Sequence, residues 1–89
     1  MSEVTRTTTV ASSSGLHARP ASLFVQTVTA SGHQVTIAKG DKSANAASIL
    51  ALLGLGVNTG DEVTLTVNGD DADATADSLV EFLNTDHDA

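Results

Sequence analysis

The sequence has 89 residues, which is enough for one domain with one modest core. Its 11 acidic and 4 basic residues give a net charge of −7, and its only aromatic residues are two phenylalanines. This composition excludes a nucleic-acid-binding protein, which needs clustered Lys and Arg and aromatic rings for stacking. With no cysteine, the chain also lacks a disulfide framework and a thiolate metal site.

The first residues contain no apolar signal-peptide core, and no stretch approaches the roughly 18 apolar residues of a membrane span. We therefore expect a single domain over residues 1–89 that is cytoplasmic and not inserted in a membrane. No internal repeat or linker divides the sequence.

Residues 4–11 are mostly threonine and valine, whose β-branched side chains favour a strand, and the Ser/Gly-rich residues 12–15 end it. A helix is predicted from Pro20 to Ser31-Gly32, because apolar residues recur there at the spacing of one helix face. That face is formed by Ala21, Phe24, Val25 and Val28. Leu23 lies off this face, so it is either exposed or part of a second contact surface.

A hairpin follows, because apolar and polar residues alternate over residues 33–39 before the turn signal Gly40-Asp41, and residues 42–45 return as a partner strand. Ser48 is placed to cap a short helix that starts at residue 49 and ends at Gly54 or Gly56. A second alternation, over residues 63–67, predicts a strand with one buried face and one solvated threonine face.

The last helix is predicted from an apolar stripe made of Ala72, Ala76, Leu79, Val80 and Leu83. Asp70, Asp71 and Asp73 lie near its start, where the helix dipole favours negative charge. Residues 84–89 are expected to fray. The order β-α-β-β-α-β-α predicts an α+β fold in which a four-stranded, mainly antiparallel sheet is covered on one side by three helices.

Among the three histidines, His17 has neighbours that suggest chemistry. Pro20 fits the first turn of a helix, which places His17 at or just before the helix N-terminus, where anions are attracted. Arg19 adds a charge that can donate two hydrogen bonds to a phosphate. Imidazole, with an unperturbed pKa of about 6.5, provides a neutral nitrogen at neutral pH. The sequence therefore predicts a histidine that accepts a phosphoryl group.

His33 and His87 are expected to be solvated surface residues, because neither has a neighbour that suggests a ligand or a catalytic partner. No two histidines have the i, i+4 spacing of helical metal ligands, and there is no cysteine. We therefore predict no metal site and no cofactor.

The stretch Gly15-Leu16-His17-Ala18-Arg19-Pro20-Ala21 resembles the active-site motif of the HPr family, the histidine-containing phosphocarriers of the phosphoenolpyruvate:sugar phosphotransferase system. The similarity extends along the whole chain. It implies an open-faced β-sandwich of the HPr type. It also implies that His17 is phosphorylated on Nδ1 by enzyme I and passes the group to sugar-specific enzyme II A domains, as a carrier and not a catalyst. It also implies that Arg19 steadies the phosphoryl group while Ser14 and Ala18 line the site.

Residues 45–50, followed by Leu55-Gly56, resemble the segment that carries the family's regulatory serine and its short second helix. This helix is apolar nearly all the way round, and an apolar surface that the core does not need marks a partner site. The predicted docking residues are Ser22, Ile49, Leu50, Leu53 and Gly54. Ala47 and Ala51 stand where a basic residue is often found in the family, so we expect weaker electrostatic steering.

Ser48 has two interpretations. As an N-cap it contributes about 1 kcal/mol, which is sufficient to explain the residue. The resemblance also allows phosphorylation of Ser48 by an HPr kinase/phosphorylase, which would make the chain a regulatory module that binds a transcription factor. A third possibility uses the same histidine chemistry in a nitrogen-related or dihydroxyacetone phosphotransferase chain.

Overall fold

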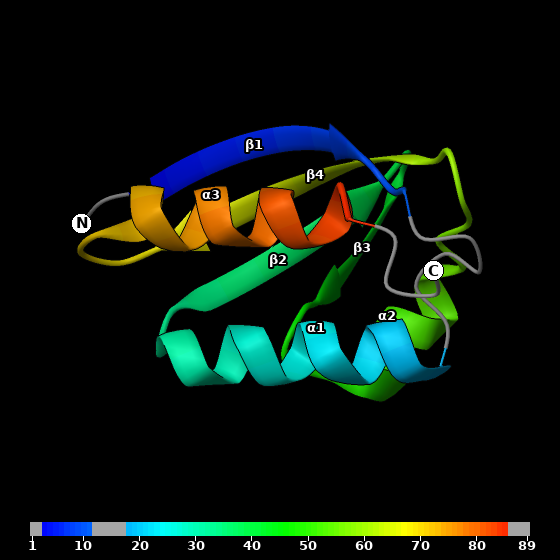
Figure 1. Cartoon of the computed structure of the whole chain (residues 1–89), viewed down its shortest axis with the longest axis horizontal. Helices are drawn as coiled ribbons and strands as arrows, with labels where there is room; N and C mark the ends of the chain where they lie inside the picture. The colour runs from blue at the N-terminus through cyan, green and yellow to red at the C-terminus, as the bar shows by residue number, and fades with distance from the viewer. Residues whose placement is uncertain (1–2, 12–17, 86–89) are drawn as a thin grey trace.

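The computed structural model describes residues 3–11 and 18–85. The observed order of elements is β-α-β-β-α-β-α, as predicted (Figure 1). The elements are β1 (Glu3–Thr9), α1 (Ala18–Ser31), β2 (Gln34–Lys39), β3 (Lys42–Asn45), α2 (Ile49–Leu55), β4 (Glu62–Asn68) and α3 (Ala72–Leu83). Among these helices, none has the length and apolar content needed to cross a membrane.

The four strands form one sheet in the order β1-β4-β2-β3, and every neighbouring pair is antiparallel. Strand β4 therefore lies between two strands that precede it in sequence. Figure 1 shows α1 and α3 on the same side of this sheet, with α3 along β1 and β4 and with α2 beside α1. The predicted open-faced sandwich with helices on one side is confirmed.

The core lies between the helices and one face of the sheet. In β4, Val63, Leu65 and Val67 are buried, and the register aligns Leu65 with Ile37 and Val67 with Val35 of β2. Phe24 of α1 meets Phe82 of α3 with ring centroids 5.6 Å apart. The helices bury the predicted stripes, and the buried helical residues are Ala21, Phe24, Val28, Leu52, Leu55, Ala72, Ala76, Leu79 and Leu83.

The predicted alternation of β4 is observed: Val63, Leu65 and Val67 are buried, and Thr64 and Thr66 on the other face are partly exposed. The two threonines are partly covered because β4 is a central strand flanked by β1 and β2. The Thr64 hydroxyl lies 3.3 Å from that of Thr7 on β1. On the helices, Val25 and Val80 are only partly buried at the margin of the core, and Leu23 is half-buried.

The ends of several elements differ from the prediction. Strand β1 ends at Thr9, and the N–H groups of Val10 and Ala11 donate to the carbonyls of Asp61 (3.0 Å) and Leu83 (2.8 Å). Helix α1 begins at Ala18, which puts Pro20 in the first turn as predicted. Helix α2 continues through Gly54 to Leu55 and is capped by Gly56, one of the two predicted ends, whose left-handed φ of 71° suits glycine.

Backbone hydrogen bonds continue for two residues beyond the last residue of α3, into the tail that is expected to fray. The N–H of Asn84 donates to the Val80 carbonyl (2.9 Å), and the N–H of Thr85 donates to Phe82 (3.2 Å). The Thr8 hydroxyl donates to Oδ1 of Asn84 (2.7 Å). These bonds extend the end of α3 and fasten it to β1. Residues 86–89 lie outside the described residues, and so does His87.

The prediction that His33 is a solvated surface residue holds only in part, because the ring is partly covered and has partners. The ring is half-buried, and both of its nitrogens have partners: Nε2 bonds the carbonyl of Asp70, and Nδ1 lies 2.8 Å from the Thr75 hydroxyl. Because a carbonyl only accepts, Nε2 carries the hydrogen, and in the neutral ring Nδ1 accepts from Thr75. A Cβ on Gly69 would lie 2.8 Å from Cδ2 of this ring, so glycine makes room for it. His33 thereby joins the start of β2 to the start of α3.

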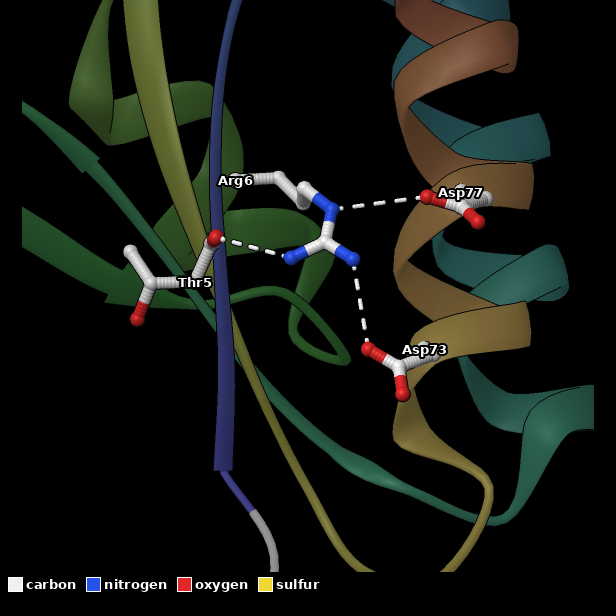
Figure 2. A network of polar contacts seen from close by, with 4 residues as sticks. All are labelled: Thr5, Arg6, Asp73 and Asp77. Carbon is white, nitrogen blue, oxygen red and sulfur yellow. Dashed lines mark hydrogen bonds and ion pairs between the residues drawn. The ribbon is translucent and has the colours of Figure 1, made fainter.

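Acidic residues lie at the start of α3 as predicted, with Asp71 as the N-cap residue and Asp73 in the first turn. The Asp71 side chain makes no capping hydrogen bond. Asp73 also pairs with Arg6 of β1, whose Nη2 lies 3.2 Å from Oδ1 of Asp73 and whose Nε lies 3.4 Å from Oδ1 of Asp77. Figure 2 shows this guanidinium between the two carboxylates, with Nη1 donating to the carbonyl of Thr5 (3.2 Å). Through these ion pairs Arg6 links edge strand β1 to α3.

Candidate docking surface and phosphoryl-transfer site

The residues predicted to carry the phosphoryl chemistry surround the start of α1. His17 and Ser14 lie outside the described residues, and of Ala18 and Arg19 only the backbone is described. Helix α1 begins at Ala18, the residue after His17 in the sequence. The first turn of a helix has N–H groups without intrahelical partners, and these groups attract anions. The N-terminal end of α1, where free N–H groups favour an anion, therefore follows His17 directly in the sequence.

Helix α2 exposes three large apolar side chains, Ile49 (38%), Leu50 (80%) and Leu53 (37%), which we call the α2 patch. Leu52 and Leu55 of the same short helix are buried. One exposed leucine on a protein surface is ordinary, but three exposed apolar residues within one turn of helix form a patch. The sequence prediction that this helix has more apolar surface than the core uses is confirmed.

Both ends of α2 are capped. The Ser48 hydroxyl accepts from the N–H of Ala51 (3.3 Å), as predicted for an N-cap, and the N–H of Gly56 donates to the Leu53 carbonyl (3.2 Å). Before the helix, the Asn45 side chain accepts from the N–H of Ala47 (2.9 Å). Because these bonds fix where the helix starts and stops, they also fix the face on which the α2 patch lies.

The other predicted docking residues lie on the two helices that meet here. Ser22 is a half-buried residue of α1, and its hydroxyl is 3.5 Å from the side-chain nitrogen of Gln26. Gly54 is exposed on α2, and a Cβ added there would meet nothing within 4 Å. Since α1 packs against α2, the structure brings these residues and the α2 patch onto one pair of helices.

The α2 region carries no charge. Residues 43–60 contain no Asp, Glu, Lys or Arg, and the positions of Ala47 and Ala51 add none. Acidic residues gather instead on α3 and the turn before it, namely Asp70, Asp71, Asp73, Asp77 and Glu81. Helix α2 itself therefore offers a partner apolar and uncharged side chains, and the acidic cluster lies on another helix.

Sequence reasoning missed two residues beside α2. Lys39 lies 2.8 Å from the Asp61 carboxylate, and the hydrogen bond it donates is the main reason why the pKa of Asp61 is held below the ordinary 3.8. The N–H of Asn58 also donates to this carboxylate and lowers the pKa further, while burial opposes both effects. No local sequence pattern predicts this ion pair, because its two residues lie far apart in sequence. Among the described residues, no cluster of His, Asp and Glu could hold a metal ion.

Comparison with known proteins agrees with this arrangement. The sequence model of the family described as "PTS HPr component phosphorylation site" matches residues 4–85. Phosphocarrier protein HPr of Streptomyces coelicolor is 51% identical over 70 residues, which cover 78% of this chain and 75% of the relative. Phosphocarrier protein HPr of Haloferax volcanii is 45% identical over 82 residues, 90% and 92% of the two chains.

A solved HPr from Bacillus anthracis superposes with a TM-score of 0.89 at 34% identity, covering 93% of this chain and 99% of that one. Related proteins with other names also match. HPr-like protein Crh of Bacillus subtilis is 42% identical over 78% of this chain and 81% of its own length, and phosphocarrier protein NPr of Shewanella violacea is 35% identical over 99% and 97%. From its fold and from these matches, the chain belongs to the HPr family of phosphotransferase-system phosphocarriers.

Proposed function

We propose that this chain carries a phosphoryl group from phospho-enzyme I, on His17 Nδ1, to enzyme II A domains for sugar uptake. The observation that carries the proposal is the exposed α2 patch on a helix that packs against α1, the helix that begins one residue after His17. The proposal places the protein in the cytoplasm as a monomer that needs no cofactor.

In the proposed reaction, the neutral Nδ1 of His17 attacks the phosphorus, the bond between phosphorus and the donor breaks, and a P–N bond forms. The phosphoryl group carries close to two negative charges, so Arg19 and the first-turn N–H groups of α1 stabilise it on the carrier. Ser14 and Ala18 line the site. Onward transfer requires that this stabilisation stay modest, because a tightly bound ground state raises the barrier to leaving.

Partner docking is proposed on the α2 patch, with Ser22 and Gly54 at its margin. The patch offers Leu50 almost fully exposed, so a partner gains most of the transfer free energy of that side chain on contact. Because residues 43–60 carry no charge, affinity on this face comes from apolar contact.

The proposal is tested by incubating the protein with enzyme I and radiolabelled phosphoenolpyruvate. We expect one acid-labile phosphate per chain in the wild type and in Ser48→Ala, and none in His17→Ala. Ser48→Ala is the control, because it removes the other candidate phosphorylation site. Labelling that survives in His17→Ala would show that the assignment is wrong.

A regulatory module acting through Ser48 is the alternative, and the similarity to Crh favours it. Ser48 lies at a helix N-terminus, which accommodates a phosphate, although its hydroxyl is already used as a cap. An acid-stable phosphate on Ser48, formed with an HPr kinase/phosphorylase and needed for binding a transcription factor, would support this alternative. Ser48→Ala should abolish both the acid-stable phosphate and the binding of the transcription factor.

A second alternative is that the protein is a carrier in a nitrogen-related or dihydroxyacetone phosphotransferase chain, and the similarity to NPr supports considering it. The histidine chemistry is identical in these chains, so only the acceptor distinguishes them. Transfer rates from the phosphorylated protein to acceptor domains of each class separate the alternatives, and the sugar-uptake proposal predicts the fastest transfer to a sugar-specific enzyme II A domain.

A further inference from the structure

One lysine fastens the end of α2. Nζ of Lys39, at the end of β2, donates to the carbonyl of Gly56 (2.7 Å) and lies 2.8 Å from Oδ2 of Asp61. Both side chains are about two-thirds covered, with 33% and 29% of their surface exposed. Gly56 is the C-cap of α2, so Lys39 neutralises the negative end of the docking helix and holds its last carbonyl.

The same loop is fastened to the strand that leads toward His17. Oδ2 of Asp61 accepts from the N–H of Asn58 (2.8 Å), which closes residues 56–61 into a compact turn. The carbonyl of Asp61 accepts from the N–H of Val10 (3.0 Å), and the carbonyl of Val10 accepts from Gly60 (2.9 Å). After Val10 and Ala11 the chain enters residues 12–17. One turn thus bonds to the docking helix at one end and to the exit of β1 at the other.

This arrangement differs from the other ion-pair cluster of the described residues. Arg6 pairs with Asp73 and Asp77 and joins β1 to α3, and among the described residues its guanidinium bonds only to Thr5, Asp73 and Asp77. It lies on a more exposed surface, with 38% of the Arg6 side chain open to solvent. Arg6 is therefore a matched control, an ion pair of β1 that is remote from the docking helix.

We infer that Lys39 and Asp61 are positioning residues, which hold the α2 patch in a fixed relation to the strand entering the His17 segment. The inference rests on the proposed phosphocarrier function. A partner that docks on α2 meets the phosphoryl group only if the two parts keep this relation. Without these hydrogen bonds and this ion pair, a smaller fraction of molecules holds the α2 patch and the strand in the binding-competent arrangement. The apparent affinity for the partner falls in proportion to that fraction, while the chemistry in the docked complex is unchanged.

The first test is the kinetics of enzyme I-dependent phosphorylation with Lys39→Met, Asp61→Asn, Lys39→Arg and Arg6→Gln. We expect the KM for this protein to rise about fivefold in Lys39→Met and Asp61→Asn, the lower end of usual coupling effects, with kcat unchanged. Lys39→Arg should restore most of the affinity, because a guanidinium also donates to a carbonyl and a carboxylate. Arg6→Gln should leave KM unchanged. All variants are assayed at a temperature at which unfolding curves show each to be folded.

The second test needs no enzyme. Amide hydrogen exchange at Val10 should accelerate in Lys39→Met and in Asp61→Asn, and should stay at the wild-type rate in Arg6→Gln. Unchanged exchange at Val10 in Asp61→Asn, the milder of the two variants, would overturn the inference even if Lys39→Met does not fold.

The inference is also wrong if Lys39→Met and Asp61→Asn leave KM at the wild-type value, or if Arg6→Gln raises it equally. A fall in kcat without a rise in KM would overturn it too. Failure of the proposed phosphocarrier function would give a different result. In that case the wild-type protein itself would take no phosphate from an enzyme I that labels a known carrier.

Discussion

Leu50 separates the docking role of α2 from its role in the core. The side chain is 80% exposed, so the substitution Leu50→Ala removes three carbons that the folded chain barely covers. At about 0.8 kcal/mol for each fully buried carbon, the substitution should lower the free energy of unfolding by no more than about 0.5 kcal/mol. If a partner covers the exposed part, binding should lose up to about 2 kcal/mol, which is roughly 30-fold in Kd.

Leu52→Ala is the matched control on the same helix. Leu52 is fully buried, so its truncation should lower the free energy of unfolding by about 2–5 kcal/mol through lost burial and a residual cavity. The free energy of unfolding is measured by urea titration of each variant. The affinity for enzyme I is measured by titration calorimetry with the unphosphorylated proteins, at a temperature at which both variants are folded.

Two results would refute this reasoning. A loss of stability in Leu50→Ala as large as that in Leu52→Ala would place Leu50 in the core. An unchanged Kd for enzyme I, with stability also unchanged, would show that the α2 patch is not where this partner docks.

Three further predictions concern other parts of the structure. Gly54→Ala should raise the free energy of unfolding by about 0.5–1 kcal/mol, because a helical glycine is replaced where a Cβ meets nothing, and urea titration would show any fall that contradicts this. Arg6→Gln should cost no more than about 1 kcal/mol, and the cost should shrink at high salt, since the pairs with the two α3 carboxylates are exposed; a cost unchanged by salt would contradict an electrostatic origin. The pKa of Asp61 is depressed in the folded state, so its stabilising contribution is present above the ordinary 3.8 and is lost as the pH falls through the lower folded-state value. Urea titrations at several pH values should therefore show that Asp61→Asn loses less stability than the wild type as the pH falls through this range. The same pH dependence of the free energy of unfolding in both proteins would contradict this prediction.

Much of the fold follows from local patterns. The spacing of Ala21, Phe24 and Val28 predicts a buried helix face, and the alternation over residues 63–67 predicts a buried strand face. Ser48 is recognisable as an N-cap because the capping bond spans only three residues. These features depend on the helix and strand periods and on neighbouring residues, which a single sequence displays.

The polar contacts between distant segments could not be predicted in this way. Asp73 fits the helix dipole, yet it also pairs with Arg6, which lies at the other end of the chain. His33 has no informative neighbour in sequence, and only the folded chain brings Thr75 to its ring. Lys39 and Asp61 meet because β2 ends beside the loop after α2. Each contact depends on the packing of elements that are far apart in sequence.

For the site, the residue pattern and the family motif contributed separately. The excess of leucine in residues 49–55 indicates an exposed apolar helix from composition alone, and the structure confirms its exposure. The roles of His17 and Arg19 come from a helix start and from the motif that resembles the HPr family, and they stay predictions. The positioning network on the far end of α2 is visible only in the three-dimensional structure.

The most direct test of the central claim is onward transfer from phosphorylated His17. The protein is labelled with enzyme I and phosphoenolpyruvate, separated from both, and mixed with a sugar-specific enzyme II A domain. The proposed function predicts that acid-labile phosphate leaves this protein and appears on the acceptor, with no label on His17→Ala at the first step. Phosphate that stays on the wild-type protein with every acceptor domain, or label that persists in His17→Ala, would contradict the claim.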